Sequence, residues 1–220
     1  MSIKEKISKL FRPYRNKKRQ KYFLKKYGEV NGNYIILSNN CIGGMCYHDA
    51  NKEFLSPTIN LYIDDFLTFA SNVKEYVSCD IKEVENSGFE YPVAVLEPKG
   101  LPPINVYFVH YNSFLEGKEK WIERSKRMLS QDGKLCIIYS IPKSKVIDDN
   151  IRDNFLKINA YRKLCFYRET KVELPQNTES TSFVMIPKQY QNMDYSKYIG
   201  LLSRKRYFDK FFNIFYFLFK

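Results

Sequence analysis

Residues 34–44, YIILSNNCIGG, place an apolar run directly before a turn rich in asparagine and glycine. The run from Tyr34 to Ser38 has the β-branched and large apolar residues that are typical of a buried strand. The residues after it are typical of a turn, and we expect a short helix near Met45 to Ala50. This pattern predicts a strand-to-helix unit, from which α/β proteins are built.

The same alternation continues along the chain. Asp64 can N-cap a helix that runs to about Val77, and Ser113 with Glu116 forms a capping box for a helix that reaches about Leu129. Further strands are expected at residues 56–63, 92–96, 104–109, 135–139 and 182–186, with a weaker one at 164–167. We therefore predict an α/β fold: a layered sheet of about five to seven mostly parallel or mixed strands with flanking helices, and basic or aromatic helical extensions at both ends.

The formal charge of +12 is concentrated at the two ends of the chain. Residues 1–27 carry eleven Lys/Arg and one Glu, residues 200–220 carry five Lys/Arg and one Asp, and the body between them carries 20 basic and 22 acidic side chains. A nucleic-acid-binding domain would carry the basic excess on its body, so we do not expect nucleic acid as a partner. We predict a basic amphipathic extension at 1–28, an α/β domain at 29–190 and an amphipathic aromatic helix at 191–220.

The cysteines and the first residues of the chain both indicate the cellular compartment in which the protein is expected. Five cysteines, an odd number scattered along the sequence, make a poor disulfide framework, so we expect reduced thiols. The first residues alternate charged with apolar side chains and lack the apolar core of a signal peptide. Both features predict a cytoplasmic protein.

Three segments within roughly residues 33–130 together resemble the bacterial domain-of-unknown-function family numbered nineteen-nineteen, often labelled exopolysaccharide biosynthesis protein. They are the strand with the turn at 38–44, the SPT motif at 56–58 with the Asp65-Phe66 helix, and Tyr91-Pro92 followed by FVHYNS at 108–113, Glu116, Lys120-Trp121, Arg124 and Arg127. The resemblance implies a setting in the assembly of capsular or extracellular glycans and carries no catalytic assignment. Gly117 stands where we would expect Ala.

Polar residues follow the predicted strands, at positions where open α/β sheets bind ligands. His110 is the candidate catalytic base, because an imidazole titrates near neutral pH. In our interpretation the turn amides and glycines cradle a phosphate or sugar hydroxyls, while the arginines hold a diphosphate or a uronic acid carboxylate. The candidate substrate-binding residues, several of which we expect to meet around one pocket with His110, are Asn39, Asn40, Cys41, Gly43, Gly44, Ser56, Tyr111, Asn112, Trp121, Arg124 and Arg127.

Each of these residues also has a structural interpretation. Asparagine and glycine dominate turns whatever the function, and His110 can bond to backbone at the rim of the sheet. Cys41 fits a packed thiol better than a nucleophile, because the sequence fixes no base beside it. Trp121 is more typical of a core position. Arg127 is placed to pair with Glu123, which leaves Arg124 as the stronger candidate for ligand contact.

Cofactors are not expected. His48 with Cys41 and Cys46 matches no common zinc spacing. Asp64-Asp65 leaves a divalent metal as an alternative, since one glycosyltransferase class holds a metal and a nucleotide-sugar diphosphate with two aspartates, although that class has a residue between them. The sequence contains neither a Walker-type loop nor a dinucleotide-binding glycine fingerprint, so kinase and dehydrogenase interpretations lose their main support.

The C-terminal run from Tyr207 to Phe219 is too aromatic for a solvated tail and too short to cross a bilayer. Basic residues next to such a run attract anionic lipid while the rings enter the interface. The candidate membrane-binding residues are Arg204, Lys205, Arg206, Phe208, Phe211, Phe212 and Phe215, assisted by the basic N-terminal extension. The alternative is that the aromatic helix docks on the domain itself or on a partner subunit.

Together these features predict a protein peripheral to the inner face of the cell membrane. We expect it to handle a nucleotide-activated or lipid-linked sugar in surface-polysaccharide assembly, as a transferase. One alternative is a non-catalytic adaptor that recruits other glycan-assembly enzymes. Another is nucleic-acid binding through the basic extension, which predicts a steep salt dependence.

Overall fold

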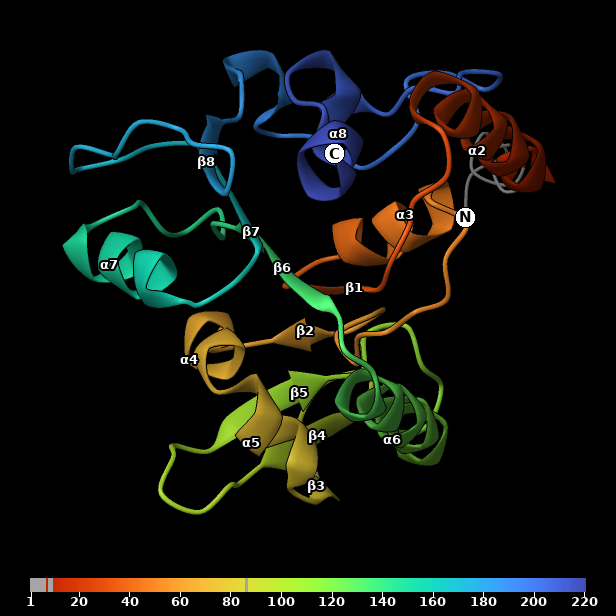
Figure 1. Cartoon of the computed structure of the whole chain (residues 1–220). Coiled ribbons are helices and arrows are strands. Elements are labelled where there is room, and N and C mark those ends of the chain that lie inside the picture. Colours follow the sequence, from red (N-terminus) through yellow and green to blue (C-terminus); the bar gives the residue numbers. More distant parts are fainter. Residues whose placement is uncertain (1–6, 8–9, 86) are drawn as a thin grey trace. The chain divides into compact units, whose positions relative to one another are not determined.

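The computed structural model describes residues 7, 10–85 and 87–220 (Figure 1). The chain divides into two compact units. Unit 1 contains the chain up to Asn31, Met45–Glu53 and Ile186–Lys220, and unit 2 contains Gly32–Gly44 and Phe54–Met185. Both ends of the chain thus belong to the same unit. The division into 1–28, 29–190 and 191–220 stays a prediction.

Unit 2 contains a four-stranded parallel sheet in the order β1-β6-β7-β8 (Figure 1). Its strands are β1 (Tyr34–Ser38), β6 (Lys134–Ser140), β7 (Arg162–Tyr167) and β8 (Thr181–Met185). All five residues of β1 are buried, as expected for a strand of a parallel sheet, which is commonly covered on both faces. Ser38 pairs with Ile138 of β6, so the carboxyl ends of these two strands lie at the same edge.

A second, antiparallel sheet in unit 2 has the order β2-β5-β4-β3. Its strands are β2 (Tyr62–Ile63), β3 (Ile81–Glu83), β4 (Val93–Leu96) and β5 (Ile104–Tyr107). The α/β class is therefore confirmed, with parallel and antiparallel strands in separate sheets instead of one mixed sheet. The short connection between β4 and β5 explains the separation, because it can join antiparallel neighbours but is too short for a parallel crossover.

The strand expected at 56–63 is wrong except at its last two residues, which form β2. Residues 57–60 form turns, and Asn60 has a positive φ of 65°. The hydroxyl groups of Ser56 and Thr58 lie 2.9 Å apart and bond to each other, and the Thr58 hydroxyl accepts a hydrogen bond from the Ser38 amide. Side-chain hydrogen bonds of this kind compete with a strand ladder.

The helices of unit 2 are α4 (Phe66–Ser71), α5 (Val73–Ser78), α6 (Phe114–Ser130) and α7 (Asp149–Lys157). The single helix expected after Asp64 is wrong in two respects. Its cap is Asp65, whose carboxylate accepts from the Thr68 amide, and the helix is interrupted at Asn72, whose side chain donates to the Thr68 carbonyl. Asparagine favours such local side-chain bonds over helix continuation.

Helix α6 confirms the start predicted from its capping signal. The Ser113 hydroxyl accepts from the Glu116 amide, as an N-cap should. The Glu116 carboxylate accepts from the amide of Asn112, one residue before the cap. Trp121 and Met128 are buried on the inner face of the helix.

Unit 1 contains α2 (Arg12–Tyr27), the end of α3 (Ile42–Asp49), the 3-10 turns η1 (Lys188–Tyr190) and η2 (Tyr207–Lys210), and α8 (Ile214–Phe219). Pro13 lies in the first turn of α2, where it has no helical hydrogen bond to remove, so it does not interrupt the helix. Gly28 ends α2 with a positive φ of 73°, as predicted. The ring of Phe23 stacks on Phe215 of α8, with centroids 4.2 Å apart.

Candidate functional site

A cysteine and a histidine meet in unit 2. Cys41 directly precedes α3, just beyond the carboxyl end of β1, and His110 lies three residues after β5. The Nε2 of His110 lies 3.5 Å from the Sγ of Cys41, within the range of a hydrogen bond to sulfur. His110 is exposed and Cys41 is partly exposed. The pair therefore combines a nucleophilic group with a base at a position that small molecules can reach.

Asn39 and Asn40 hold the turn before Cys41 against the end of β6. The Asn39 amide group donates to the Ser140 carbonyl at 2.9 Å and accepts from the Ser140 amide at 2.9 Å. The Asn40 side chain donates to the Ser140 hydroxyl and accepts from the Ile42 amide. These hydrogen bonds position the turn that carries Cys41, and a substrate-binding role for the two asparagines stays a prediction.

Gly43 and Gly44 are required by close packing. A β-carbon on Gly43 would lie 2.5 Å from the Oγ of Ser38, and one on Gly44 would lie 3.2 Å from Ile59. The Ser38 hydroxyl also accepts from the Gly43 amide. This amide and that of Ile42, which we predicted to cradle a phosphate, are thus already bonded to side chains. Gly43 thus allows the start of α3 to lie against Ser38 of β1, and Gly44 lies against Ile59.

Most of the other predicted substrate-binding residues form the internal frame of unit 2. Arg124 is buried and donates to the Ile59 carbonyl and to the Tyr111 hydroxyl. Trp121 and Ser56 are buried as well, and Trp121 packs near Phe69. Both hydrogen bonds use Nη1 of Arg124, and a diphosphate-binding role for this residue stays a prediction.

Arg127 and Asn112 lie nearer the surface. Arg127 donates to the Phe54 carbonyl and pairs with Glu123, the partner expected from the sequence. Asn112 is exposed, and its amide donates to Glu116. Of the candidate substrate-binding residues, the structure brings Cys41, which was not predicted to lie beside His110, within hydrogen-bonding distance of it, and joins Tyr111 to Arg124 in a buried cluster.

The neighbouring residues Asp64 and Asp65, which the sequence offered as an alternative metal site, both form hydrogen bonds within unit 2. Asp64 accepts from the Asn105 amide and from the Asn105 side chain, and Asp65 caps α4. Among the residues that the structure describes, no group of three or more His, Cys, Asp or Glu side chains is placed to hold a metal ion. The expectation of no cofactor stays a prediction, with a divalent metal at Asp64 and Asp65 as its alternative.

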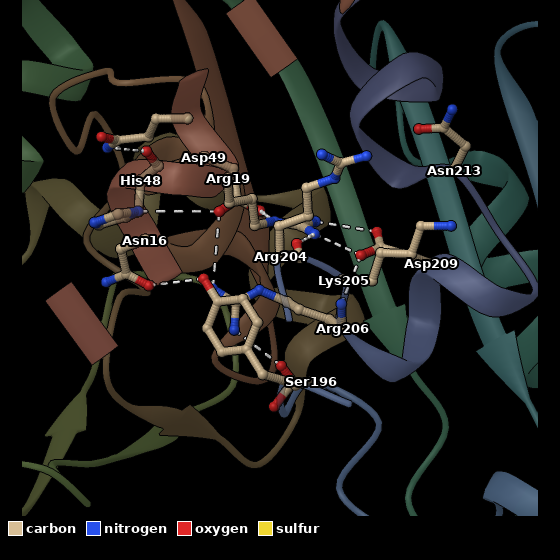
Figure 2. A network of polar contacts seen from close by, with 12 residues as sticks. Asn16, Arg19, His48, Asp49, Ser196, Arg204, Lys205, Arg206, Asp209 and Asn213 are labelled. Carbon is tan, nitrogen blue, oxygen red and sulfur yellow. Dashed lines mark hydrogen bonds and ion pairs between the residues drawn. The ribbon is translucent and has the colours of Figure 1, made fainter. Parts of the chain in front are cut away.

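A buried network of charges in unit 1 was not predicted (Figure 2). Arg19 of α2 lies between two carboxylates, donating to Asp49 at the end of α3 and to Asp209 in η2 (Figure 2). Arg206 donates to the Ser196 carbonyl, and its Nη2 lies 3.8 Å from Asp49. The network joins three chain segments and fixes which face of α2 is turned inward.

The charged neighbours of Asp49 and Arg19 shift the pKa values of these two groups. Burial alone would raise the pKa of Asp49, but the nearby guanidinium groups of Arg19 and Arg206 outweigh burial and lower it. Burial likewise disfavours the charge on Arg19, but Asp49 and Asp209 outweigh it and raise the Arg19 pKa. The Asp49 carboxylate and the Arg19 guanidinium group therefore stay ionised inside the protein.

Several predicted membrane-binding residues lie in the interior of unit 1. Phe208 and Phe215 are buried, and Arg206 is only 6% exposed. These side chains pack within the unit, and the predicted lipid contact and its docking alternative both stay predictions. Phe211 and Phe212 are partly exposed, and Arg204 and Lys205 remain at the surface.

Comparison with known proteins gives two findings. Residues 8–218 match the family model described as Domain of unknown function (DUF1919). The chain belongs to this family. It is also 33% identical over 116 residues to a Haemophilus influenzae protein whose printed name is "Uncharacterized protein". That match covers 50% of this chain and 53% of the relative, so the chain spans about half the length of the curated relative it matches.

The sequence contained both members of the candidate pair but could not place them together. Cys41 and His110 are 69 residues apart, and each was identified only as a residue that follows a strand. Ser140, which anchors both asparagines, ends the neighbouring strand and could have been noted on the same ground. Arg15, Arg19 and Phe23 repeat every four residues along α2, which is the signal that could have revealed the buried face of that helix.

Proposed function

We propose that this DUF1919 protein is a transferase of surface-polysaccharide biosynthesis that handles a nucleotide-activated or lipid-linked sugar. The observation that carries the proposal is the Cys41–His110 pair, in which a base and a thiol face each other at an accessible position. The family resemblance supplies the glycan setting. We include in the proposal that the protein acts at the inner face of the cell membrane.

In the proposed reaction His110 acts as the general base. A hydroxyl of the acceptor glycan displaces the weak thiol hydrogen bond and approaches Nε2 of the imidazole. The hydroxyl oxygen attacks the anomeric carbon of the donor sugar and gives its proton to His110. The bond from that carbon to the phosphate of the donor breaks, and the nucleotide or lipid diphosphate leaves with the bonding electrons.

The test is a search for a donor with the full-length protein. Nucleotide sugars are screened for an increase in melting temperature, since a ligand that binds the folded state stabilises it. Release of nucleotide from a stabilising donor is then measured for wild type, His110→Ala and the control Lys126→Ala, which changes an exposed side chain of α6. We expect the His110 variant to lose turnover and keep its melting temperature, while the control retains both.

Two results would contradict the proposal. If no nucleotide sugar or lipid-linked sugar raises the melting temperature, the protein does not bind the proposed donor. If the His110 variant turns over a donor at the wild-type rate, His110 is not the base. If turnover is absent from wild type and from all variants, the adaptor alternative gains support.

The distance between Cys41 and His110 also favours a second mechanism for the same transfer. Here His110 takes the proton of the thiol, and the Cys41 thiolate attacks the activated carbon of the donor. A carbon–sulfur bond forms, the bond to the leaving group breaks, and the leaving group takes the proton from His110. The oxygen of an acceptor hydroxyl then attacks the same carbon, the carbon–sulfur bond breaks, and the hydroxyl proton passes through His110 to the released Cys41 sulfur. Cys41→Ala separates the two mechanisms, because only the second requires the sulfur atom.

The proposed membrane location is peripheral. None of the helices in the described part of the chain is both long and apolar enough to cross a bilayer. In our proposal, attachment uses surface charge and exposed apolar side chains. The exposed side chains of α2 in unit 1 include both kinds.

A further inference from the structure

Helix α2 is exceptional in its charge. Between Arg12 and Tyr27 it carries eight Lys or Arg residues and no Asp or Glu. Two of these, Arg15 and Arg19, are buried together with Phe23. Arg19 is held by Asp49 and Asp209, and Phe23 stacks on Phe215. These contacts fix the inner side of the helix, and the lysines at positions 17, 18, 21 and 25 lie on its outer side.

The outer side of α2 combines lysines with apolar side chains. We call this outer side the basic face. Its side chains are all exposed and belong to Tyr14, Lys17, Lys18, Lys21, Leu24 and Lys25. At about 100° per residue these six positions fall within one stripe of the helix surface. Tyr14 and Leu24 are each 54% exposed, and Leu10 just before the helix is 77% exposed.

A neighbouring loop of unit 1 extends this surface. The Lys18 ammonium group lies 3.5 Å from the Leu202 carbonyl oxygen, and the Leu202 side chain is 57% exposed. The guanidinium group of Arg204 lies over the ring of Tyr22, 4.2 Å from its centroid. Arg204 and Lys205 are exposed. The C-terminal loop therefore adds both charge and apolar area beside α2.

We propose that the basic face of α2, with Leu202 and Arg204 of the adjacent loop, binds a surface of anionic lipid. Lysines can reach lipid phosphates while their aliphatic stems lie on apolar groups, and exposed leucine and tyrosine side chains enter the headgroup region. Nucleic acid is the less favourable occupant, because exposed leucines gain little from a phosphate backbone. The inference deepens the proposed membrane location and rests on it, but it moves the contact from the aromatic C-terminus to α2.

The first test compares charge variants of the full-length protein in vesicle sedimentation. The vesicles contain equal parts of phosphatidylglycerol and phosphatidylcholine, or phosphatidylcholine alone. Lys17→Glu/Lys21→Glu reverses two charges of the basic face, and the control Lys126→Glu/Lys145→Glu makes the same change at exposed lysines of unit 2. We expect the first variant to bind anionic vesicles roughly tenfold or more weakly than the control, since each basic residue near such a surface contributes about fivefold.

The second test concerns the apolar side chains. Leu24→Ser/Leu202→Ser removes two exposed apolar groups and leaves the charge unchanged. We expect this variant to bind at low salt and to lose the binding that wild type retains at high salt, because salt screens charges and leaves apolar contacts intact. Circular dichroism verifies that all variants keep their helices.

Three outcomes would overturn the inference. Wild type could stay in the supernatant with anionic vesicles, or the basic-face variant could bind as tightly as the unit 2 control. A duplex oligonucleotide could also displace the protein from vesicles and bind it more tightly than lipid does at the same salt. None of these results would alter turnover in the His110 test, so failure of the lipid contact is distinguishable from failure of the proposed chemistry.

Discussion

Gly117 of α6 lies so close to Phe108 that a β-carbon at this position would be 2.6 Å from the phenyl ring. The glycine is therefore a packing requirement between the helix and the chain that leads to His110. In an exposed helix, Gly→Ala would be stabilising by about 1 kcal/mol. Here we expect the opposite sign, since overpacking a core costs about 1–3 kcal/mol.

Gly117→Ala should thus lower the free energy of unfolding. Urea unfolding followed through Trp121, the single tryptophan of the chain, measures the effect in the same helix. Lys126→Ala on the exposed side of α6 is the matched control and should change stability little. A Gly117 variant more stable than wild type would show that Phe108 moves aside easily.

Arg19→Ala should be strongly destabilising, by about 3–5 kcal/mol, because it leaves buried carboxylates without their cation. Arg19 is 2% exposed and contacts both Asp49 and Asp209. Calorimetry of the variant against Lys17→Ala, an exposed lysine of the same helix, measures the loss. The double variant Arg19→Ala/Asp49→Asn should recover part of it, and no recovery would mean that lost packing, not charge, dominates.

The buried carboxylate of Asp49 predicts a pH dependence of stability. Its folded pKa is lowered from the ordinary value of 3.8, so the ionised form is favoured in the folded protein. The stabilisation is present above the ordinary pKa and is lost as the pH falls through the folded pKa. Melting temperatures should therefore fall less steeply with acid for Asp49→Asn than for wild type. Asp132→Asn, at an exposed position, should keep the wild-type slope.

Local signals predicted the elements that depend on local bonds. The Ser113 cap, the Gly28 stop and the buried run from Tyr34 to Ser38 were confirmed, because each is determined by neighbouring residues. The error at residues 56–63 has a different origin. The apolar residues there are typical of a strand, but Ser56 and Thr58 bond to each other, and the Thr58 hydroxyl accepts from the Ser38 amide at the end of β1.

Local sequence signals were also insufficient at the candidate site. The sequence indicated that polar residues follow the predicted strands, but it could not show which of them are already bonded. Asn39, Asn40 and Arg124 have the chemistry of ligand-binding groups, yet in the structure their side chains bond to Ser140, Ile59 and Tyr111. Only the tertiary fold brings Cys41 to His110, because the sequence separation of 69 residues leaves no periodic signal.

The accessible pair predicts selective chemistry at one of the five cysteines. Burial raises the pKa of Cys46 and Cys165, and it raises that of Cys136 to about 12, so these thiols should be inert. Burial also raises the pKa of Cys79. Cys41 is partly exposed beside His110, and iodoacetamide at neutral pH should modify it first. Mass spectrometry of proteolytic peptides measures the rate at each position.

Replacement of His110 tests whether the imidazole activates this thiol. His110→Ala should slow alkylation of Cys41 by roughly tenfold, because a base that accepts the thiol proton increases the thiolate fraction. Lys126→Ala should react at the wild-type rate. In unfolded protein all five cysteines should react alike, which confirms that the fold causes the selectivity. An unchanged alkylation rate in the His110 variant would show that the imidazole does not activate the Cys41 thiol. Faster modification of Cys79 than of Cys41 would show that the thiol beside His110 is not the selectively reactive one.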